Sequence, residues 1–370
     1  MPLLKLRFRH TLFVASLMTG TPMSIREIFM FRRGSPLLAI VASAAAIAPG
    51  ALADPVAEFY QGRQITVILN QADGGVNGLY ARTVADRMSA HVPGNPKLII
   101  QGMPGAGGTK GANYCYNVAP KDGSTLCHLL MATPHAQMLG TTGVRYDSAK
   151  FTWIGRTASA NSGLYVWHTE KPQTLMDARE HEVVLGATGK ASETYTDPTI
   201  LNAVLGTKFK VILGYPGGSA LDLAVERQEV RGQSGPLIAV ITRKPQWLEK
   251  KQVRYLFQSG TTPHPLLKEV PLLTSFARND EERQLFAFLS SRADLGRAFS
   301  APPALPPERT AALRKAFMDT MNDPAFLADA KKRRIDVMPK DHLFIEDTVA
   351  SLLATPPHII GKAKQALGLK

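Results

Sequence analysis

The chain has 370 residues, of which 45% are hydrophobic and 20% are charged, a composition typical of a globular protein and not of a disordered or collagen-like one. This length is sufficient for two ordinary domains or one large one, and no apolar run approaches the roughly 18 to 20 residues of a membrane-spanning helix. The net charge of +13 comes from basic residues that are spread along the chain without interleaved aromatic residues. This pattern argues against a nucleic-acid partner and suits the attraction of anionic solutes.

The first 53 residues carry the signals of protein export. Arg32 and Arg33 precede an apolar, alanine-rich run over residues 36–48, and a small-residue exit ends at Ala53. A charged region, a short apolar region and an A-x-A-like exit are the parts of a secretory signal peptide. The alternative is a buried helix or a membrane anchor, but the run is too short to span a bilayer. We therefore expect residues 1–53 to be a signal peptide and the mature chain, with a net charge near +8, to be periplasmic.

From residue 64 the chain alternates strand-like and helix-like segments, joined by glycine-rich loops. Short apolar, β-branched runs predict strands at 65–69, 98–100 and 125–131, and helical spacing of apolar residues predicts helices near 79–88 and up to about 118. The alternation predicts a parallel sheet with helices on both faces. Because ligands bind beyond the carboxyl ends of the strands in such sheets, we expect three loops to converge there, over residues 72–77, 104–109 and 133–137.

The same pattern restarts near residue 151. Predicted strands lie near 151–154 and at 164–167, 183–185, 209–213 and 253–257, and predicted helices lie near 196–205, 220–227, 308–322 and 324–334. A second α/β unit follows, with its own glycine loops. We therefore expect an α/β protein of two lobes with a ligand cleft between them. Residues 54–156 and 276–370 would form the first lobe, and residues 157–275 the second.

The sequence contains two cysteines, Cys115 and Cys127. The first lies late in a predicted helix and the second in the strand that follows, so contact between them is possible. An oxidising compartment would allow them to form a disulfide. The alternative is a pair of small, buried, unlinked side chains, and the sequence leaves both open.

Sequence motifs of catalysis are missing or incomplete. The segment Gln233-Ser234-Gly235 lacks the spacing of a nucleophile elbow, and no two histidines have metal-ligand spacing. Residues 186–190 resemble a phosphate loop, but two residues instead of four separate the first glycine from the Gly-Lys pair. Residues 105–107 lack the third glycine of a dinucleotide fingerprint, where Lys110 stands. We therefore expect no enzyme activity, no metal and no cofactor.

Glycine loops that open helices are the remaining candidates for a site. Such a loop directs backbone N–H groups at one point, and the helix dipole adds partial positive charge, which together suit an anion. The alternative for any single loop is that its glycines serve only the tight turn. Because several such loops occur in both predicted lobes, we expect a shared anion site.

The loop sequences resemble those of a known family, the receptors of tripartite tricarboxylate transporters, or Bug family. The likeness extends over residues 57–335 and is most specific in its first third. The segments that carry it are 59–68, 74–82, Asn95-Pro96, 104–109, 112–114, 119–123, 215–223, 302–314 and Asp323-Pro324. The resemblance implies an extracytoplasmic receptor with a Venus-flytrap fold, which captures a small carboxylate and delivers it to a membrane permease. A ligand-sensing protein of the same fold that feeds a signalling partner is the alternative, and a monomer is expected in either case.

Family members hold their ligand largely through backbone amides and ordered waters, so the resemblance also implies a set of ligand-binding residues. These residues are Ala72, Asp73, Gly74, Gly75, Asn77, Thr133, His135, Thr188, Gly189, Ala191, Ser192, Tyr215, Gly217 and Gly218.

Two positions depart from the family pattern. Gly78 stands where many members have an aspartate that faces a ligand amine or hydroxyl, which argues against an amino-acid ligand of that type. Asp73 stands where many members have a small apolar residue, and an acid is awkward at an anion site. It could point outward, accept a ligand hydroxyl or cap the following helix. Lys190 could supply a counter-charge or be a solvated lysine.

Overall fold

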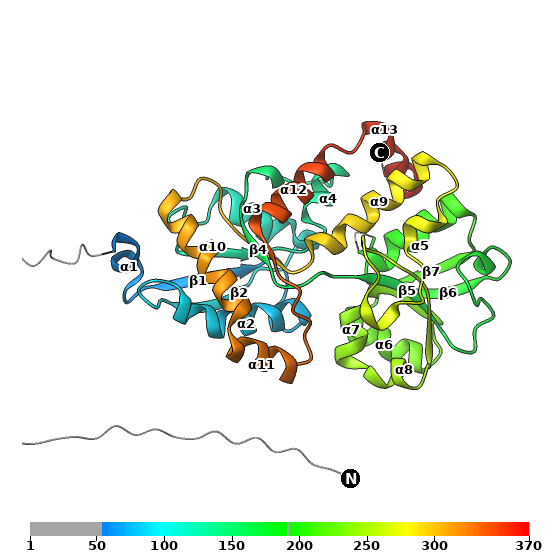
Figure 1. The fold of residues 1–370 in the computed structure, drawn as a ribbon. Coiled ribbons are helices and arrows are strands. Elements are labelled where there is room, and N and C mark those ends of the chain that lie inside the picture. The colour runs from blue at the N-terminus through cyan, green and yellow to red at the C-terminus, as the bar shows by residue number, and fades with distance from the viewer. Residues whose placement is uncertain (1–53, 191, 370) are drawn as a thin grey trace, which may run out of the picture. The chain divides into compact units, whose positions relative to one another are not determined.

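The computed structural model describes residues 54–190 and 192–369, which contain two β-sheets with helices packed against them (Figure 1). The expected signal peptide lies outside these residues. None of the helices in the described part of the chain combines the length and apolar character that a membrane crossing requires.

The first sheet has six strands in the order β11-β4-β10-β3-β1-β2 and the second has five in the order β7-β6-β8-β5-β9. The strands of the first sheet are β1 (Gln64–Leu69), β2 (Lys97–Gly102), β3 (Thr125–His128), β4 (Thr152–Arg156), β10 (Ala298–Ala301) and β11 (Lys340–Asp341). Those of the second are β5 (Ser162–Trp167), β6 (Val183–Ala187), β7 (Phe209–Leu213), β8 (Gly232–Pro236) and β9 (Val253–Gln258). The chain thus enters the second sheet between residues 156 and 162 and returns to the first between residues 258 and 298.

The parallel arrangement predicted for the first three strands is confirmed, but both sheets also contain antiparallel strands. Strands β1, β2 and β3 are parallel to one another, but β10 is antiparallel to both β3 and β4. In the second sheet β6 runs parallel to β7 and β8, while β5 is antiparallel to β8 and β9. Strands β5 and β10 are the first strands after the two crossings between sheets, and the short β11 is also antiparallel to its neighbour β4.

The helices flank both sheets. They are α1 (Pro55–Tyr60), α2 (Val76–Met88), α3 (Thr109–Asn117), α4 (Thr133–Met138), α5 (Glu193–Leu205), α6 (Gly218–Glu226), α7 (Leu237–Arg243), α8 (Pro245–Glu249), α9 (Asp280–Leu295), α10 (Pro307–Asn322), α11 (Pro324–Lys332), α12 (His342–Leu353) and α13 (Pro357–Ala366). Figure 1 shows α2, α10 and α11 beside the first sheet and α5 to α8 beside the second.

Helix α9 begins with a side-chain N-cap and ends at Gly296, where neighbouring backbone leaves no room for a side chain. The side chain of Asn279 accepts a hydrogen bond from the backbone N–H of Glu282, and three acidic residues occupy the first turn, where the helix dipole favours them. At the other end Gly296 has φ of +50°, and a Cβ there would lie 2.1 Å from the carbonyl oxygen of Ala158. Gly296 therefore lets the chain pass close to the segment that links the two sheets.

The largest hydrophobic cluster contains residues of both sheets. Trp153 of β4 and Leu164 of β5 belong to it, together with Phe286 of α9. Two smaller clusters lie against one sheet each, and a third joins Tyr80 of α2 to Ile238 of α7. The two sheets consequently share part of one core.

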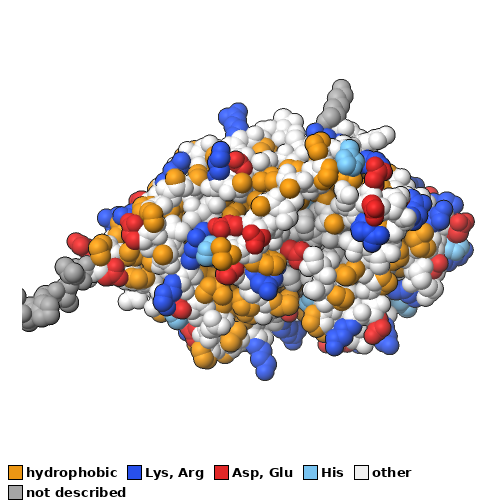
Figure 2. Space-filling model, turned by 45° about the horizontal axis from the view of Figure 1, so that its top comes forward, with side chains coloured by type: hydrophobic (Ala, Val, Ile, Leu, Met, Phe, Trp, Pro, Cys, Tyr) orange, Lys and Arg blue, Asp and Glu red, His pale blue; other side chains and the backbone are white. Residues whose placement is uncertain are grey.

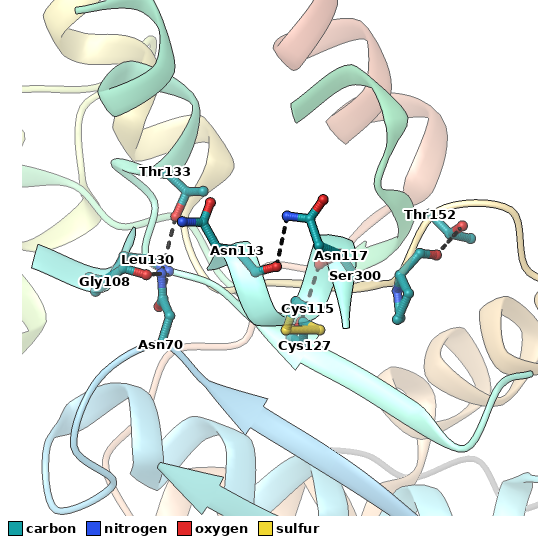
Figure 3. Close-up of a disulfide and its surroundings, with 11 residues drawn as sticks. Asn70, Gly108, Asn113, Cys115, Asn117, Cys127, Leu130, Thr133, Thr152 and Ser300 are labelled. Atoms are coloured by element: carbon teal, nitrogen blue, oxygen red, sulfur yellow. Dashed lines mark hydrogen bonds between the residues drawn. A yellow bond between two sulfur atoms is a disulfide. The ribbon is translucent and has the colours of Figure 1, made fainter. Parts of the chain in front are cut away.

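Cys115 and Cys127 form a disulfide between the last turn of α3 and β3, with Cα atoms 6.4 Å apart (Figure 3). Both residues are completely buried. Of the two possibilities that the sequence left open, the structure therefore has the linked pair.

Candidate functional site

A cavity of 780 Å³ lies between the loops of the two sheets. From the first sheet, its walls come from the loops after β1, β2 and β3. From the second sheet, they come from the loops after β6, β7 and β8. Two arginines also line the cavity, one from α9 and one from the residues that follow it. The polar residues of the wall are Asn70, Gln71, Asn77, Thr188, Lys190, Ser192, Glu193, Thr194, Gln233, Arg243, Arg292 and Arg297.

Asn70 joins three of the loops in the first sheet (Figure 3). Its Nδ2 donates to the carbonyl of Gly108 at 3.2 Å and to Oγ1 of Thr133 at 3.3 Å, and its Oδ1 accepts from the backbone N–H of Leu130 at 2.8 Å. A Cβ on Gly108 would lie 2.8 Å from this amide nitrogen, and Gly108 has φ of +96°. The glycine is therefore needed for both the backbone conformation and the close approach of α3.

Four of the longer helices begin at the cavity. Residues at or next to the N-termini of α2, α3, α5 and α6 line its wall, and each of these helices has at least nine residues. Within the described residues, no side chain caps any of the four. Their first backbone N–H groups and the positive ends of their dipoles face a common space, as a site for an anion requires.

Arg297 is the lining residue with the least compensated charge. It is 4% exposed, and its only side-chain hydrogen bond among the described residues goes from Nη1 to Oδ1 of Asn77. Its guanidinium carbon lies 5.5 Å from the ring centroid of Tyr80, and its Nε has no partner. Burial lowers the pKa of Arg297 from its ordinary value.

The other two arginines of the wall have carboxylate partners. Arg292 donates from Nη2 to Asp197 at 2.5 Å, and Asp197 also accepts from Ser234 at 2.7 Å. Arg243 donates from Nε to Asp222 at 2.5 Å. Both carboxylates are 1% exposed, so each of these wall arginines is held by a buried acidic partner.

Glu193 is the one acidic side chain that lines the described part of the wall. It is the first residue of α5, and its Oε2 accepts from Ser162 Oγ at 2.8 Å. Burial raises its pKa, against the lowering influence of Arg292 and Arg297. The neutral acid is therefore favoured beyond the pH range of an ordinary glutamate.

Part of the predicted ligand-binding set lines the cavity. These residues are Ala72, Asn77, Thr188, Gly189, Ser192 and Gly218. Other predicted residues are not in its wall, namely Asp73, Gly74, Gly75, Thr133, His135, Tyr215 and Gly217. Ala191 lies outside the described residues.

The third loop enters the cavity earlier along the chain than expected. The lining residues are 130–132 instead of 133–137, because β3 ends at His128 and residue 133 already begins α4. His135 is buried behind the wall, where its Nε2 donates to the carbonyl of Phe288 at 2.8 Å. Burial lowers its pKa to about 3, so it is a neutral core histidine.

The course of the loop after β1 explains both departures from the family pattern. A Cβ on Gly78 would lie 1.7 Å from the carbonyl oxygen of Asp73, so this loop leaves no room for an aspartate at position 78. The side chain of Asp73 is 59% exposed and lies 3.8 Å from Arg82. Of the alternatives for Asp73, the structure has the outward-pointing one. Lys190 lines the cavity but is exposed.

Sequence reasoning missed the charged residues of the wall, Arg292, Arg297 and Glu193. A signal for the arginines does exist. Residues 285–301 are mostly apolar and buried, so charged side chains within this segment need an explanation. The surface gives no such signal, because basic and acidic side chains are interspersed over the face in Figure 2. Within the described residues, no three histidine, cysteine or acidic side chains are grouped to hold a metal ion.

The fold has several counterparts among solved structures. A TctC solute-binding protein from Polaromonas is 17% identical, with a TM-score of 0.62 over 82% of this chain and 99% of that one. A protein of R. palustris with adipate is 18% identical, with a TM-score of 0.61 over 83% and 98%. MatC from Rhodopseudomonas palustris with bound malate is 17% identical, with a TM-score of 0.59 over 81% and 99%. No protein-family model matches the chain, and no curated protein does. The chain thus has the two-lobed fold of the periplasmic solute-binding proteins of the TctC type.

Proposed function

We propose that this protein is an extracytoplasmic receptor that captures a small carboxylate in the cavity and delivers it to a membrane permease of the tripartite tricarboxylate type. The observation that carries the proposal is the convergence of four helix N-termini and a buried guanidinium on one cavity. These groups offer positive charge and N–H donors in a place shielded from water, where both interact strongly with an anion. The ligands named for similar structures, adipate and malate, are carboxylates.

The polar groups of the wall suit binding better than chemistry. Ser192 is the one serine of the described wall, and its hydroxyl contacts Thr188, Thr194 and the carbonyl of Gly189. None of these groups can accept a proton as a general base, so nothing activates the hydroxyl as a nucleophile. We therefore propose a monomeric binding protein without catalytic activity, located in the periplasm as the first 53 residues predict.

Calorimetry on the purified protein tests the proposal. The titrants are adipate, malate, citrate, hexanoate, 3-phenylpropanoate and glutamate, each with its uncharged amide as the matched control. We expect at least one acid to bind about 100-fold more tightly than its amide, because the amide loses the charge-assisted hydrogen bonds. Equal binding of acid and amide, or no binding of any acid, would contradict a carboxylate receptor.

A further inference from the structure

Arg297 is a buried arginine that makes no ion pair with any of the described residues. Arg292 pairs with Asp197 and Arg243 with Asp222, whereas the direct contacts of the Arg297 guanidinium are the neutral amide of Asn77 and the ring of Tyr80. A buried charge without a counter-ion is costly. Glu193 also faces Arg297, but the two form no ion pair, and Oε2 of Glu193 accepts from Ser162 instead.

The position of Arg297 is fixed by its backbone. Its N–H donates to the carbonyl of Ala158 at 2.9 Å, and its own carbonyl accepts from Thr157 at 3.1 Å. Both partners belong to the segment that links the sheets. Gly296 permits this close approach, and Asn77 holds one guanidinium nitrogen. The backbone contacts and Asn77 thus hold the guanidinium in a fixed position at the wall, which suits charge-assisted hydrogen bonding to a carboxylate.

Apolar side chains dominate the rest of the wall. Both sheets contribute them, namely Val76, Leu130, Met131, Leu221, Ala239 and Val240. A wall of this kind gains free energy by covering an apolar surface and loses it by desolvating a second charge. The volume of 780 Å³ leaves room for a ligand body well beyond a single carboxylate.

No second buried cation in the described wall is free for another carboxylate. Arg243 is not fully buried, with 28% of its side chain exposed, and it donates from Nε to Asp222, which also accepts from Gln233 at 3.0 Å. Lys190 is exposed and therefore solvated. A ligand with two or three carboxylates would leave at least one of them without a buried partner.

We infer that the ligand is an amphipathic monocarboxylate, whose single carboxylate binds Arg297 and whose aliphatic or aromatic body contacts the apolar wall. This inference rests on the proposed function and narrows its substrate class. Arg297 is then the specificity-determining residue, and the backbone N–H groups of the helix N-termini supplement it.

A pair of ligands of equal chain length tests the substrate class on the unmodified protein. Hexanoate and adipate differ only in the second carboxylate. We expect hexanoate to bind at least about tenfold more tightly, because adipate must desolvate a second charge. If adipate, malate or citrate binds as tightly as the monoacids, the inference is overturned while the carboxylate receptor stands. If no acid binds, the receptor proposal itself falls.

Two arginine variants test the anchor. In Arg297→Gln the affinity for the monoacid should fall about 100-fold, with loss of the preference for the acid over its amide. The matched control is Arg156→Gln, because Arg156 is also a buried arginine but lies outside the wall, and its variant should keep wild-type affinity. Wild-type affinity in Arg297→Gln would overturn the inference. If that variant fails to fold, Arg297→Lys replaces it, because lysine retains the charge but not the planar guanidinium. Its affinity should fall about tenfold, and unchanged affinity would also overturn the inference.

Discussion

At the scale of single residues, Glu193 and Arg297 share a buried site with opposite consequences for an anion. Arg292 of α9, Asp197 of α5, Ser162 of β5 and Arg297 before β10 face the Glu193 carboxyl. Burial raises the pKa of Glu193 above its ordinary value of 4.5, so the neutral acid persists to higher pH. A neutral Glu193 does not repel a ligand carboxylate, whereas an ionised one does.

The affinity for a carboxylate should therefore fall as the pH rises through the pKa of Glu193. Above that pKa the dissociation constant should increase by up to about tenfold per pH unit, because the proton must be restored for binding. The measurement is calorimetry between pH 5 and pH 9. Glu193→Gln should remove this dependence, whereas Glu269→Gln, a change at an exposed glutamate, should retain it. A profile that is the same in the wild type and in Glu193→Gln would contradict a role for this carboxyl.

A site residue could be predicted from the sequence where local chain geometry determines its position, and not where a contact between distant residues does. The glycine loops follow local rules of chain geometry, so Ala72, Asn77 and Gly189 could be located at the cavity from the sequence. Arg297 comes close to Asn77 across 220 residues of sequence, and no local pattern encodes this contact. The role of His135 in turn depends on its burial against Phe288, which the sequence does not reveal.

At the scale of elements, the absence of a side chain at Gly78 lets the loop after β1 pass close to the first turn of α2. Alanine normally stabilises a helix interior relative to glycine by about 1 kcal/mol. In Gly78→Ala, however, the new Cβ would lie 1.7 Å from the backbone oxygen of Asp73, and either the loop or α2 must shift. We expect a loss of about 1–3 kcal/mol in the free energy of unfolding, measured by denaturant titration.

The matched control for this change is Gly361→Ala in α13. A Cβ on Gly361 would meet no atom within 4 Å, so the ordinary helix propensity should apply. The free energy of unfolding should rise by about 0.5–1 kcal/mol. Equal effects of the two substitutions would show that the loop after β1 does not constrain position 78.

The disulfide joins α3 to β3 beside the loops that form the cavity (Figure 3). It closes a short loop, since 12 positions separate the two cysteines. The double variant Cys115→Ala/Cys127→Ala should lose about 3 kcal/mol of stability, because its unfolded chain gains conformational freedom. Denaturant titration of the oxidised wild type and the double variant measures this difference. Coincident unfolding curves would contradict a stabilising role for the bond.

The sequence predicted elements where local signals are strong and missed those that depend on distant partners. Strands β1, β7 and β9 were expected within one residue of their observed ends, because each is an apolar, β-branched or aromatic run. Strand β8 has the sequence Gly-Gln-Ser-Gly-Pro and forms only because β5 and β6 pair with it. Helix α9 was also missed, although Asn279 caps it, because its apolar positions serve a core that both sheets share.

At the scale of the whole molecule, that shared core bears on how the protein unfolds. Two sheets with separate cores would unfold independently. Here, one hydrophobic cluster contains Trp153 of the first sheet, Leu164 and Phe257 of the second, and Phe286 of α9 between them. Exposure of this cluster in either sheet removes contacts from the other, which couples the two transitions.

The three tryptophans make this coupling measurable. Trp153 lies in the first sheet, whereas Trp167 and Trp247 pack together in the second, with ring centroids 5.5 Å apart. A variant that retains only Trp153 and one that retains only Trp247, with phenylalanine at the other positions, report on one sheet each. After correction for the effect of each tryptophan substitution on stability, the fluorescence transitions of both variants in denaturant should have one midpoint. That midpoint should also be the one measured by far-ultraviolet circular dichroism, as a single cooperative unit requires.

The variant Phe286→Ala, made in both backgrounds, tests the role of the shared cluster. It should lower the midpoint by the same amount for both probes, because loss of a buried phenylalanine costs about 3–5 kcal/mol. Midpoints that already differ between the two probes in the presence of Phe286 would mean that each lobe unfolds on its own and that the shared cluster does not couple them.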